Sequence, residues 1–428
     1  MNDLFLPGSI EDKTTLSQWL HYLATIHHRP IDMSLDRVFA VAQRMGLQKS
    51  FKTITVTGTN GKGSTAVALN SILQHAGYHV GLYTSPHLLR YNERICINSR
   101  ACSDEDIMAA FAIVETARQQ TTLTFFEFST LAALWLFQEA AIDVAVLEVG
   151  LGGRLDAVNI VDTDCAVITN VAIEHTHYLG LTREAIALEK AGIMRPQRPA
   201  VFGEYDVPAT LWQHAQALDV PLAVLGRHFN YICLDHHWRF LMKNSDFNLP
   251  YPPLSGEHQL RNAGLAIAAL LSMQNEMPVK PEAMASGLQN MFIPARLQRI
   301  ADQPIIYVDV AHNPHAVSVL TQTLPKPPRL VRTIAVFAAL DDKDIESMAM
   351  IMAPFVDIWH VSQCSVPRAA SLERITAAIE GTGTRAISVF PTIGRAFAAA
   401  KCLASPADCI VVFGSFHTVA EVLQDGGV

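Results

Sequence analysis

The sequence predicts an α/β fold: a domain with a mostly parallel sheet, covered by helices on both faces, precedes a smaller Rossmann-like α/β domain. Two observations lead to this prediction. Apolar, β-branched runs alternate with helix-like segments in both halves of the chain, which is typical of parallel sheets covered on both faces. The length of 428 residues also exceeds what one hydrophobic core usually serves. We therefore expect two domains, residues 1–294 and 295–428.

The first predicted domain begins with helix-type spacing of apolar residues over positions 14–47, which indicates a helical lead-in. An irregular, β-rich stretch with turn signals covers about 200–254, and a helix rich in alanine and leucine is expected over 256–273. Between the lead-in and the irregular stretch, strands are predicted at 52–56, 79–83, 143–149 and 165–171.

The second predicted domain begins after Phe292-Ile293-Pro294-Ala295, which is interpreted as a short hinge. It lacks the G-x-G-x-x-G pattern, so no dinucleotide is assigned to it. Its strands are predicted near 304–310, 333–339, 357–362, 386–390 and 409–413. Ligands of parallel sheets bind at the carboxyl ends of the strands, so polar residues that follow strands are the candidates for a site.

Composition excludes several classes of function. Charged residues make up 17% of the chain and the formal net charge is −8, which argues against the broad basic surface that nucleic acid requires. The seven cysteines form no C-x-x-C pair and are expected to stay reduced. Neither an export signal nor an apolar run of roughly 20 residues, the length of a membrane span, is visible. We expect a cytoplasmic monomer that binds small molecules, with no nucleic-acid or membrane partner.

A glycine-rich P-loop follows the first predicted strand and leads into a helix-like segment. This arrangement aims backbone N–H groups and the positive end of a helix dipole at one point, which suits the phosphates of a nucleotide triphosphate. Compared with G-x-x-x-x-G-K-[ST], Val56 occupies the place of the first glycine and Gly63 displaces the hydroxyl residue by one position. An ordinary glycine-rich βα turn is the alternative. The predicted phosphate contacts are Gly58, Thr59, Asn60, Gly61, Lys62, Gly63 and Ser64.

Polar residues also follow the other predicted strands of the first domain. Ser85 follows the second strand, Glu148 lies at the end of the third and His175 lies just beyond the fourth. Mg²⁺ on phosphates needs few protein ligands, chiefly hard oxygens, and Ser85 and Glu148 meet that need. A helix cap or a solvated loop position is equally open for each of these two. On chemistry alone His175 is better interpreted as a hydrogen-bonded loop histidine.

Two residues suggest a pocket for a flat heterocycle. Phe126 lies in an aromatic run that could stack on such a ring, although aromatic runs more often belong to a core. Asp156 could accept two parallel N–H bonds from an aminopyrimidine edge, the contact that a pterin requires.

The second domain carries its own polar strand ends. Asp309 is well placed to bind ribose hydroxyls, although Asp309 and Asn313 could instead build a turn with Pro314. Ser415 follows the last strand and would start a helix, where its hydroxyl and the adjacent N–H groups could hold a substrate carboxylate. A simple N-cap is the competing role, and the two roles are compatible.

Six segments stand in order along about 360 residues, and together they are highly specific, although one alone would be weak. They are Gly58-Thr59-Asn60-Gly61-Lys62-Gly63-Ser64, Thr84-Ser85-Pro86-His87-Leu88, Glu148-Val149-Gly150-Leu151-Gly152-Gly153-Arg154-Leu155-Asp156, Glu189-Lys190-Ala191-Gly192-Ile193, Asp309-Val310-Ala311-His312-Asn313-Pro314 and Gly414-Ser415-Phe416. The set resembles the Mur ligase superfamily and, within it, the bacterial folylpolyglutamate synthase/dihydrofolate synthase family.

The resemblance implies an ATP-dependent ligase, with ATP bound by the first domain and the amino-acid substrate approached by the second. It implies that Ser85, Glu148 and His175 bind Mg²⁺. It also implies that Lys190 is carbamylated, which turns a cation into an anion that helps to hold a second Mg²⁺. A monovalent cation is left open. The implied catalytic residues are Lys62, Lys190 and His312.

Further roles follow from the same resemblance. Asn262 would face adenine, Arg296 would lie on the phosphates and Asp309 would bind the ribose. His312 and Ser415 would lie near the incoming glutamate.

The sequence departs from the family at two positions. Ala295 and Ala338 stand where the family usually has glycine, so the approach of the backbone can differ there. Lys343, which follows Ala338 closely, is therefore only a candidate contact for glutamate or phosphate.

The expected reaction joins a carboxylate to the amine of L-glutamate. Attack of the carboxylate on the γ-phosphate of ATP gives an acyl phosphate, which the amine then displaces, with ADP and phosphate as products. Closure of the second domain would orient the amine and exclude water. We expect glutamate to be added to dihydropteroate and to reduced folates, with Phe126 and Asp156 in the pterin pocket. The alternatives are a peptidoglycan-type Mur ligase, a folylpolyglutamate synthase without dihydrofolate synthase activity, and a regulatory P-loop module.

Overall fold

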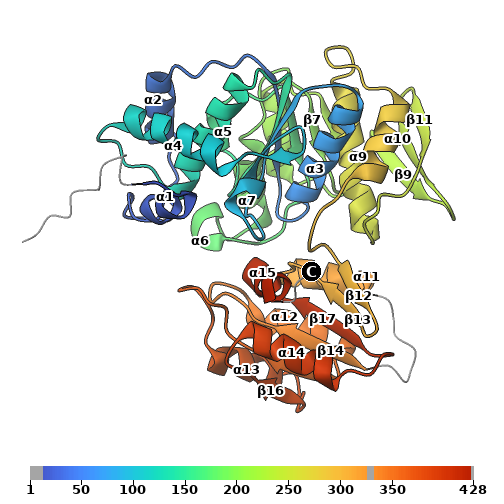
Figure 1. The fold of residues 1–428 in the computed structure, drawn as a ribbon. Coiled ribbons are helices and arrows are strands. Elements are labelled where there is room, and N and C mark those ends of the chain that lie inside the picture. The colour runs from blue at the N-terminus through green and yellow to red at the C-terminus, as the bar shows by residue number, and fades with distance from the viewer. Residues whose placement is uncertain (1–12, 325–331, 426–428) are drawn as a thin grey trace, which may run out of the picture. The chain divides into compact units, whose positions relative to one another are not determined.

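The structure is a computed structural model that describes residues 13–324 and 332–425, and it contains two compact units (Figure 1). The first unit takes the described parts of Met1–Ser85, Asn92–Pro252 and Leu260–Met291. The second takes the described parts of Pro86–Tyr91, Pro253–Gln259 and Phe292–Val428. Two short pieces of earlier chain therefore lie in the second unit, and the boundary expected between residues 294 and 295 stays a prediction.

The described residues of the first unit form an eight-stranded sheet. Its strands are β1 (Lys52–Thr57), β2 (Val80–Tyr83), β3 (Ile95–Ile97), β4 (Arg100–Ala101), β5 (Val144–Glu148), β6 (Cys165–Ile168), β7 (Ala200–Phe202) and β8 (Leu222–Val224). The spatial order is β4-β3-β2-β5-β1-β6-β7-β8, with β3 and β4 antiparallel to their neighbours and the other pairs parallel. Every residue of β5 and β6 is buried, which requires cover on both faces and confirms the predicted sheet.

Helices flank this sheet as the apolar spacing of the sequence predicts. The predicted helical lead-in consists of two helices that a loop separates. In order, the helices of the first unit are α1 (Leu16–Leu23), α2 (Asp36–Met45), α3 (Lys62–His75), α4 (Asp104–Arg118), α5 (Phe125–Glu139), α6 (Thr176–Leu179), α7 (Arg183–Ala191), α8 (Ala209–Ala217), α9 (Glu257–Ser272, which belongs to this unit from Leu260 onward) and α10 (Pro281–Asn290). The helix α3 packs on β2 and β5 and on α10, where Gly287 permits close approach to Ile72.

The stretch over residues 200–254, which is predicted to be irregular and β-rich, supplies five strands and one helix. It contains the helix α8, in which Leu211 and Ala215 are buried, so its apolar pattern is sparse. The remainder supplies β7, β8 and a separate antiparallel sheet. The strands of that sheet are β9 (Phe229–Cys233), β10 (Trp238–Met242) and β11 (Ser245–Leu249).

The second unit is built on a six-stranded sheet among its described residues. Its strands are β12 (Gln298–Asp302), β13 (Ile305–Val308), β14 (Thr333–Phe337), β15 (Ile358–Val361), β16 (Ile387–Val389) and β17 (Cys409–Phe413). The order is β12-β13-β17-β14-β15-β16, and every pair except the antiparallel β12 and β13 is parallel. The edge strand β12 has no counterpart among the predicted strands.

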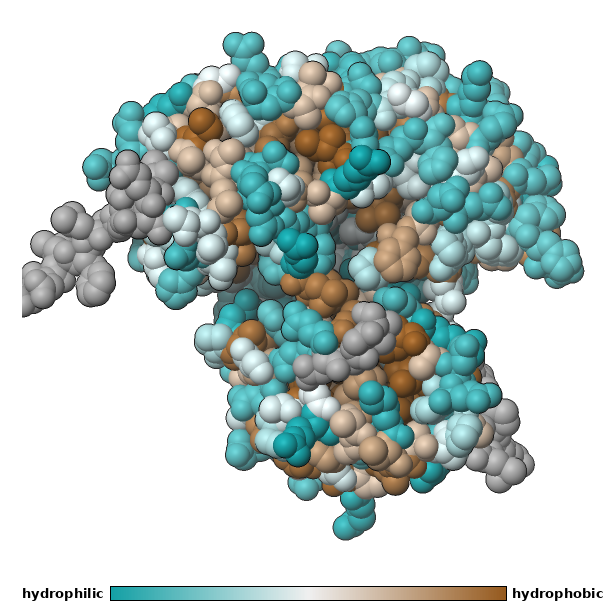
Figure 2. Space-filling view, in the orientation of Figure 1, coloured by the Kyte–Doolittle hydropathy of each residue, from teal (hydrophilic) through white to brown (hydrophobic). Residues whose placement is uncertain are grey.

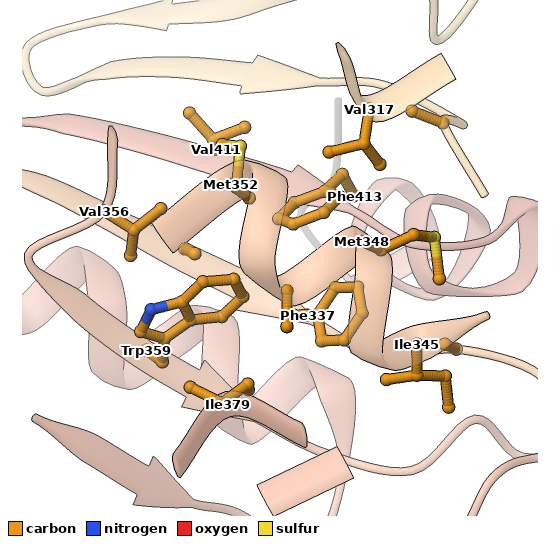
Figure 3. Packing of buried hydrophobic residues seen from close by; sticks show 14 of the residues in the cluster. Val317, Phe337, Ile345, Met348, Met352, Val356, Trp359, Ile379, Val411 and Phe413 are labelled. Carbon is orange, nitrogen blue, oxygen red and sulfur yellow. The ribbon is translucent and has the colours of Figure 1, made fainter. Parts of the chain in front are cut away.

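The central strand β17 shows why both faces of this sheet are covered. Val411 and Phe413 pack in one apolar cluster, and Ile410 and Val412 pack in another, because alternate side chains point to opposite faces. Figure 3 shows the first cluster, in which the rings of Phe337 and Phe413 have centroids 4.8 Å apart. The covering helices are α11 (Pro314–Thr323), α12 (Ile345–Met352), α13 (Leu372–Glu380), α14 (Ile393–Leu403) and α15 (Phe416–Asp425).

Hydrophilic and hydrophobic side chains are interspersed over the face drawn in Figure 2. Within the part of the chain that the structure describes, none of the helices combines the length and the apolar character that crossing a membrane would need. All seven cysteines are free thiols.

Candidate active site

The P-loop connects β1 to α3 and depends on two glycines. Gly58 has a φ of +148°, and a Cβ there would lie 1.8 Å from Oγ1 of Thr169. Gly61 has a φ of +84°, and a Cβ there would lie 2.5 Å from Oδ1 of Asn262. Both positions therefore exclude a side chain for conformational and steric reasons. The same contact places Asn262, which α9 carries and which is buried, directly beside the loop.

The N-terminus of α3 is open toward a ligand. Gly61 is the N-cap and supplies no side-chain hydrogen bond to the first turn. The first N–H groups of a helix need partners, and together with the helix dipole they favour an anion. The amine of Lys62 donates to the carbonyl oxygens of Gly58 at 2.9 Å and Thr59 at 3.2 Å, so it already lies over the loop. Ser64, in the same turn, is buried.

A residue that the sequence did not single out holds the loop in place. Asn170 follows β6, and its side chain makes two bonds to the backbone of Asn60: Oδ1 accepts from the N–H at 2.9 Å, and Nδ2 donates to the carbonyl at 2.9 Å. The carbonyl of Asn170 also accepts from the N–H of Thr59 at 3.0 Å, and the hydroxyl of Thr169 donates to the carbonyl of Asn60 at 2.6 Å. The signal in the sequence was the polar pair Thr169-Asn170 inside a predicted strand that in fact ends at Ile168.

Replacing Asn170 with aspartate is expected to weaken MgATP binding by about tenfold. The substitution keeps the shape of the side chain but replaces its hydrogen bond to the carbonyl of Asn60 with a repulsion between two oxygens. An aspartate oxygen would face the carbonyl oxygen of Asn60 where Nδ2 now donates at 2.9 Å. Loss of a buried partner costs about 1–3 kcal/mol. Titration calorimetry with MgATP checks this result. Asn290→Asp, at the exposed end of α10, is the matched control, and an equal affinity of the two variants would contradict the role of Asn170.

The structure brings Ser85 and Glu148 together at the carboxyl edge of the sheet. The N–H of Ser85 donates to Oε2 of the buried Glu148 at 3.0 Å. A Cβ on Gly63 would lie 3.6 Å from the same Oε2, so the carboxylate faces the first turn of α3. His175 lies beyond β6 as the N-cap of α6, with a φ of +46°. Among the described residues, no group of three or more histidine, cysteine, aspartate and glutamate side chains could hold a metal ion.

Ser85 and Glu148 are suited to hold a Mg²⁺ ion that is bound to a phosphate. A hydroxyl and a carboxylate are hard oxygen donors, and Mg²⁺ commonly takes one or two carboxylates and completes its shell with phosphate oxygens and water. The carboxylate of Glu148 is directed at the place where the open helix N-terminus would bind phosphate.

Lys190 is a buried cation on α7, with 1% of its side chain exposed. Its amine donates to Oε1 of Glu174 at 3.1 Å. Burial lowers the pKa of Lys190 to about 8, against the opposing charge of Glu174, and the positive charge of Lys62 adds to the shift. Burial acts to raise the pKa of Glu174, but the charges of Lys190 and Lys62 outweigh it and the pKa is lowered. Lys62, Glu174 and Lys190 therefore share one electrostatic environment.

Phe126 contacts residues at the end of β2 and just after β5, and Asp156 is hydrogen-bonded to the loop that follows β5. Phe126, in the first turn of α5, has its ring centroid 5.7 Å from that of Tyr83, and a Cβ on Gly150 would touch the ring. The carboxylate of Asp156 accepts the N–H groups of Leu151 at 2.9 Å and Val158 at 3.0 Å. A carboxylate has about four lone-pair positions, so these bonds leave capacity for a ligand.

Burial raises the pKa of Asp156 to about 7. Backbone N–H groups of Leu151, Val158 and Gly150 and the charge of Lys62 oppose this shift. The carboxyl therefore changes its charge near neutral pH.

In the second unit, Asp309 and its neighbours form a separate group. Oδ2 of Asp309 accepts the N–H of Leu297 and Oδ1 accepts that of Ala311, both at 2.7 Å. Burial raises the pKa of Asp309, and the charge of Arg296 opposes the shift. The guanidinium of Arg296 lies 5.6 Å from the ring centroid of Phe416.

His312 packs on the same aromatic ring. Its imidazole centroid lies 6.0 Å from that of Phe416. Its Nδ1 lies 2.9 Å from the carbonyl oxygen of Val310, which places the proton of the neutral ring on Nδ1 and makes Nε2 an acceptor. Arg296 and His312 therefore flank one side chain at the start of α15.

Ala295, where the family resemblance implies a glycine, has a φ of +57° and is fully buried. Alanine thus adopts the conformation that glycine adopts more easily. Its N–H donates to Oε1 of Gln298 at 2.9 Å, and its carbonyl accepts from the N–H of Val310 at 3.0 Å.

Lys343 and Ser415 are both engaged within the second unit. The amine of Lys343 pairs with Asp342 at 3.0 Å, and the guanidinium of Arg374 donates to the carbonyl of Lys343 at 3.0 Å. Ser415 is buried and accepts the N–H of Thr418 at 2.9 Å. Direct contacts of Lys343 and Ser415 with a substrate stay predictions.

Two protein-family models match this chain. The family model described as Mur ligase middle domain matches residues 56–270, and the Mur ligase glutamate ligase domain matches residues 295–416. The dihydrofolate synthase/folylpolyglutamate synthase of Escherichia coli (strain K12) is 42% identical over 411 residues, which cover 96% of this chain and 95% of that protein. The folylpolyglutamate synthase of Lacticaseibacillus casei is 37% identical over 345 residues, 75% of this chain and 79% of that protein.

Solved structures are similar over nearly the whole chain. The structure of E. coli FolC in complex with DHPP and ADP has a TM-score of 0.90 and 42% identity, and the match covers 96% of this chain and 97% of that one. A bifunctional folylpolyglutamate synthase/dihydrofolate synthase with Mn, AMPPNP and L-glutamate bound also has a TM-score of 0.90, with 38% identity and coverage of 99% and 100%.

Proposed function

The chain belongs to the Mur ligase family, among its dihydrofolate synthases/folylpolyglutamate synthases, and from this premise we propose which residues carry out the ligation. The protein is an ATP-dependent ligase that joins L-glutamate to dihydropteroate and to reduced folates and releases ADP. This conclusion rests on one observation. The N-terminus of α3, which follows the P-loop and has no side-chain cap, faces the carboxylate of Glu148.

The residues of the first unit would act on the phosphates. Lys62 would exchange its two carbonyl partners for oxygens of the β- and γ-phosphates, and the uncapped first turn of α3 would donate its N–H groups. The amine of Lys62 and these N–H groups would stabilise the negative charge that develops while the substrate carboxylate attacks the γ-phosphate to form an acyl phosphate. Ser85, Glu148 and His175 would hold Mg²⁺, which, when bound, neutralises charge on the phosphate oxygens.

Lys190 is proposed to be carbamylated. The reaction with carbon dioxide needs a neutral amine, and a pKa of about 8 leaves about a quarter of the amine neutral near pH 7.5. The product would be an anion beside Lys62, where it could help to hold a second Mg²⁺. The buried position excludes most of the water that would compete for the group.

Further contacts are proposed for the rest of the substrates. Asn262 would face the adenine, and Asp309 and Arg296 would bind the ribose and phosphates. His312 would lie near the glutamate, with Nε2 able to accept a proton from the attacking amine. We also propose a cytoplasmic location, which the free thiols support.

Release of ADP with MgATP and L-glutamate tests the function when dihydropteroate, tetrahydrofolate and a UDP-muramoyl peptide are compared as acceptors. Turnover with both pteridines is expected. Turnover with tetrahydrofolate alone would restrict the activity to chain extension, and activity with the muramoyl peptide alone would overturn the folate assignment.

The affinity for dihydropteroate is expected to rise about tenfold between pH 6 and pH 8, because only the ionised carboxylate of Asp156 can accept two parallel N–H bonds from the pterin with both oxygens. The pKa of Asp156 is raised to about 7, so the carboxyl is mostly protonated below that pH and mostly ionised above it. Fluorescence titration of dihydropteroate at several pH values checks the effect. Asp156→Asn should bind weakly with a flat pH profile, and a variant that keeps the wild-type profile would contradict the assignment.

A further inference from the structure

Each backbone polar group of Val171 and Ala172, in the segment between β6 and α6, is hydrogen-bonded to a side chain. The N–H of Val171 donates to Oε2 of Glu204 at 3.0 Å, and its carbonyl oxygen accepts from Nε of Arg183 at 3.0 Å. The hydroxyl of Thr59 in the P-loop accepts the N–H of Ala172 at 3.0 Å and donates to its carbonyl oxygen at 3.2 Å. The direction of every one of these bonds is fixed, because an N–H only donates and a carbonyl oxygen only accepts.

Arg183 and Glu204 also form an ion pair, in which Nη2 of Arg183 lies 3.0 Å from Oε2 of Glu204. This oxygen therefore accepts from the guanidinium and from the N–H of Val171 at the same time. The two side chains are 31% and 23% exposed, so water competes only in part for these bonds. Asp206 also pairs with Arg183, at 2.8 Å, but its side chain is 88% exposed, and exposed pairs contribute little.

Glu204 is placed by a close approach between the ends of β6 and β7. The N–H of Gly203 donates to the carbonyl of Ile168 at 3.0 Å, and a Cβ on Gly203 would lie 2.3 Å from the carbonyl oxygen of Thr169. Position 203 therefore excludes a side chain, and Glu204, the next residue, is brought beside Val171. The carboxylate thus starts from backbone that the parallel pairing of β6 with β7 fixes.

Arg183 lies on the same helix as Lys190. The two residues are seven positions apart in α7, which is two turns, so they share one face and lie about 10 Å apart along it. Lys190 donates to Oε1 of Glu174 at 3.1 Å, and Arg183 donates to the carbonyl of Val171. Glu174 follows Val171 by three residues, and three residues of extended chain also span about 10 Å. One face of α7 therefore holds both ends of this segment.

We propose that Arg183 and Glu204 are positioning residues for the ligation. They set the segment from Val171 to His175 against α7 and the P-loop, so that Glu174 and His175 are in place for MgATP. This inference rests on the proposed function, in which His175 is a ligand of Mg²⁺. Arg183 and Glu204 act through the two backbone polar groups of Val171, and the charge of the ion pair alone does not replace these bonds.

Two conservative variants separate the positioning of Val171 from an ordinary ion pair. Glu204→Gln keeps an oxygen that can accept from Val171 and Arg183 and removes only the charge. Arg183→Lys keeps the charge, but one ammonium cannot occupy the places of Nε and Nη2 together. The affinity for MgATP is expected to fall about tenfold in Arg183→Lys, the effect of losing one hydrogen bond from a charged donor, and to stay within about threefold of wild type in Glu204→Gln. Titration calorimetry measures both, and an ordinary ion pair would give the opposite order.

Hydrogen exchange of the Val171 amide is a second measurement, which requires neither nucleotide nor turnover. Glu204→Leu removes the acceptor of this N–H, so the amide is expected to exchange about tenfold faster than in wild type. Glu204→Ala takes its place if the leucine variant does not fold. In Arg183→Lys the KM for MgATP should rise, whereas the KM for L-glutamate should stay within about twofold.

Asp206→Asn is the matched control, because it removes a charge from the same guanidinium at an exposed position. This variant should keep the wild-type affinity for MgATP and the wild-type exchange of the Val171 amide. A change in either would show that any loss of charge around Arg183 disturbs the segment, which contradicts a specific role of the bonds to Val171.

Two further results would overturn the inference. The first is a wild-type affinity for MgATP in Arg183→Lys, because the charge of residue 183 would then be sufficient. The second is a Glu204→Leu protein whose Val171 amide exchanges faster while its affinity for MgATP is unchanged, because the position of the segment would then not matter to the nucleotide. A wild-type protein without glutamate-dependent ADP release would instead refute the proposed function and leave the exchange of the amide untouched, so the two failures are distinguishable.

Discussion

Lys62→Met is expected to lower kcat by about 10²–10³-fold, because it removes a cation aimed at charge that develops on the transferred phosphoryl group. The amine lies within the P-loop, where it donates to the carbonyl oxygens of Gly58 and Thr59. Methionine keeps much of the length of the side chain and packs readily, so the fold should be preserved. ADP release at saturating substrates measures the effect, with the thermal midpoint as a check of folding.

Lys401→Met is the matched control for this substitution, since Lys401 lies on α14, where its amine contacts the ring of Phe397. That variant should keep the wild-type kcat. A Lys62→Met enzyme that retained more than about a tenth of the wild-type kcat would contradict the role of Lys62 on the phosphates. Lys62→Met should also raise the pKa of Lys190, because the nearby positive charge that lowers it is gone.

Lys190→Met is expected to abolish measurable ligation and, compared with the unmodified lysine, to lower stability by about 3–5 kcal/mol, the cost of leaving a buried charge without its partner. The charge is that of Glu174, whose side chain is 14% exposed and which accepts from Lys190 at 3.1 Å. Denaturant unfolding measures the stability and ADP release measures the ligation. The two effects have different origins and can be separated.

The double variant Lys190→Met/Glu174→Gln makes that separation. Removing the charge of Glu174 should recover most of the stability, whereas activity should stay lost if the carbamate on Lys190 serves the reaction. Wild-type enzyme in carbon dioxide-free buffer should lose activity and regain it with bicarbonate. Recovery of activity in the double variant would show that Lys190 serves only to neutralise Glu174.

Local patterns in the sequence were sufficient to predict the P-loop, the strands β1, β2, β5 and β6 of the first sheet, and all strands of the second sheet except β12. Each of these strands is a short run of apolar residues, and Gly58 and Gly61 mark a turn that other residues cannot adopt. The pairing of Ser85 with Glu148 was also accessible, because the carboxyl ends of parallel strands share one edge. The roles of His175 and Lys190 came from the family resemblance, since neither residue has a local pattern that indicates a metal.

The features that the sequence did not reveal depend on distant contacts. Asn170 is hydrogen-bonded to Asn60 of the P-loop, 110 residues away in the sequence, and no pattern near either residue predicts this bond. The edge strand β12 forms because it pairs with β13, although its own residues alternate weakly. The buried bonds of Ser415 and Thr418 likewise arise when β14 and β17 become neighbours. Tertiary contacts of this kind override local preference.

The hydrogen bonds between Asn170 and Asn60 affect the rate at which the nucleotide binds. Both backbone polar groups of Asn60 are hydrogen-bonded to the side chain of Asn170. The conformational entropy that a mobile loop would lose on association has therefore already been lost during folding. Association then requires the nucleotide to find the correct orientation, but it does not require the loop to find its conformation. The binding energy of the phosphates is not spent on ordering the protein and can stabilise the transition state.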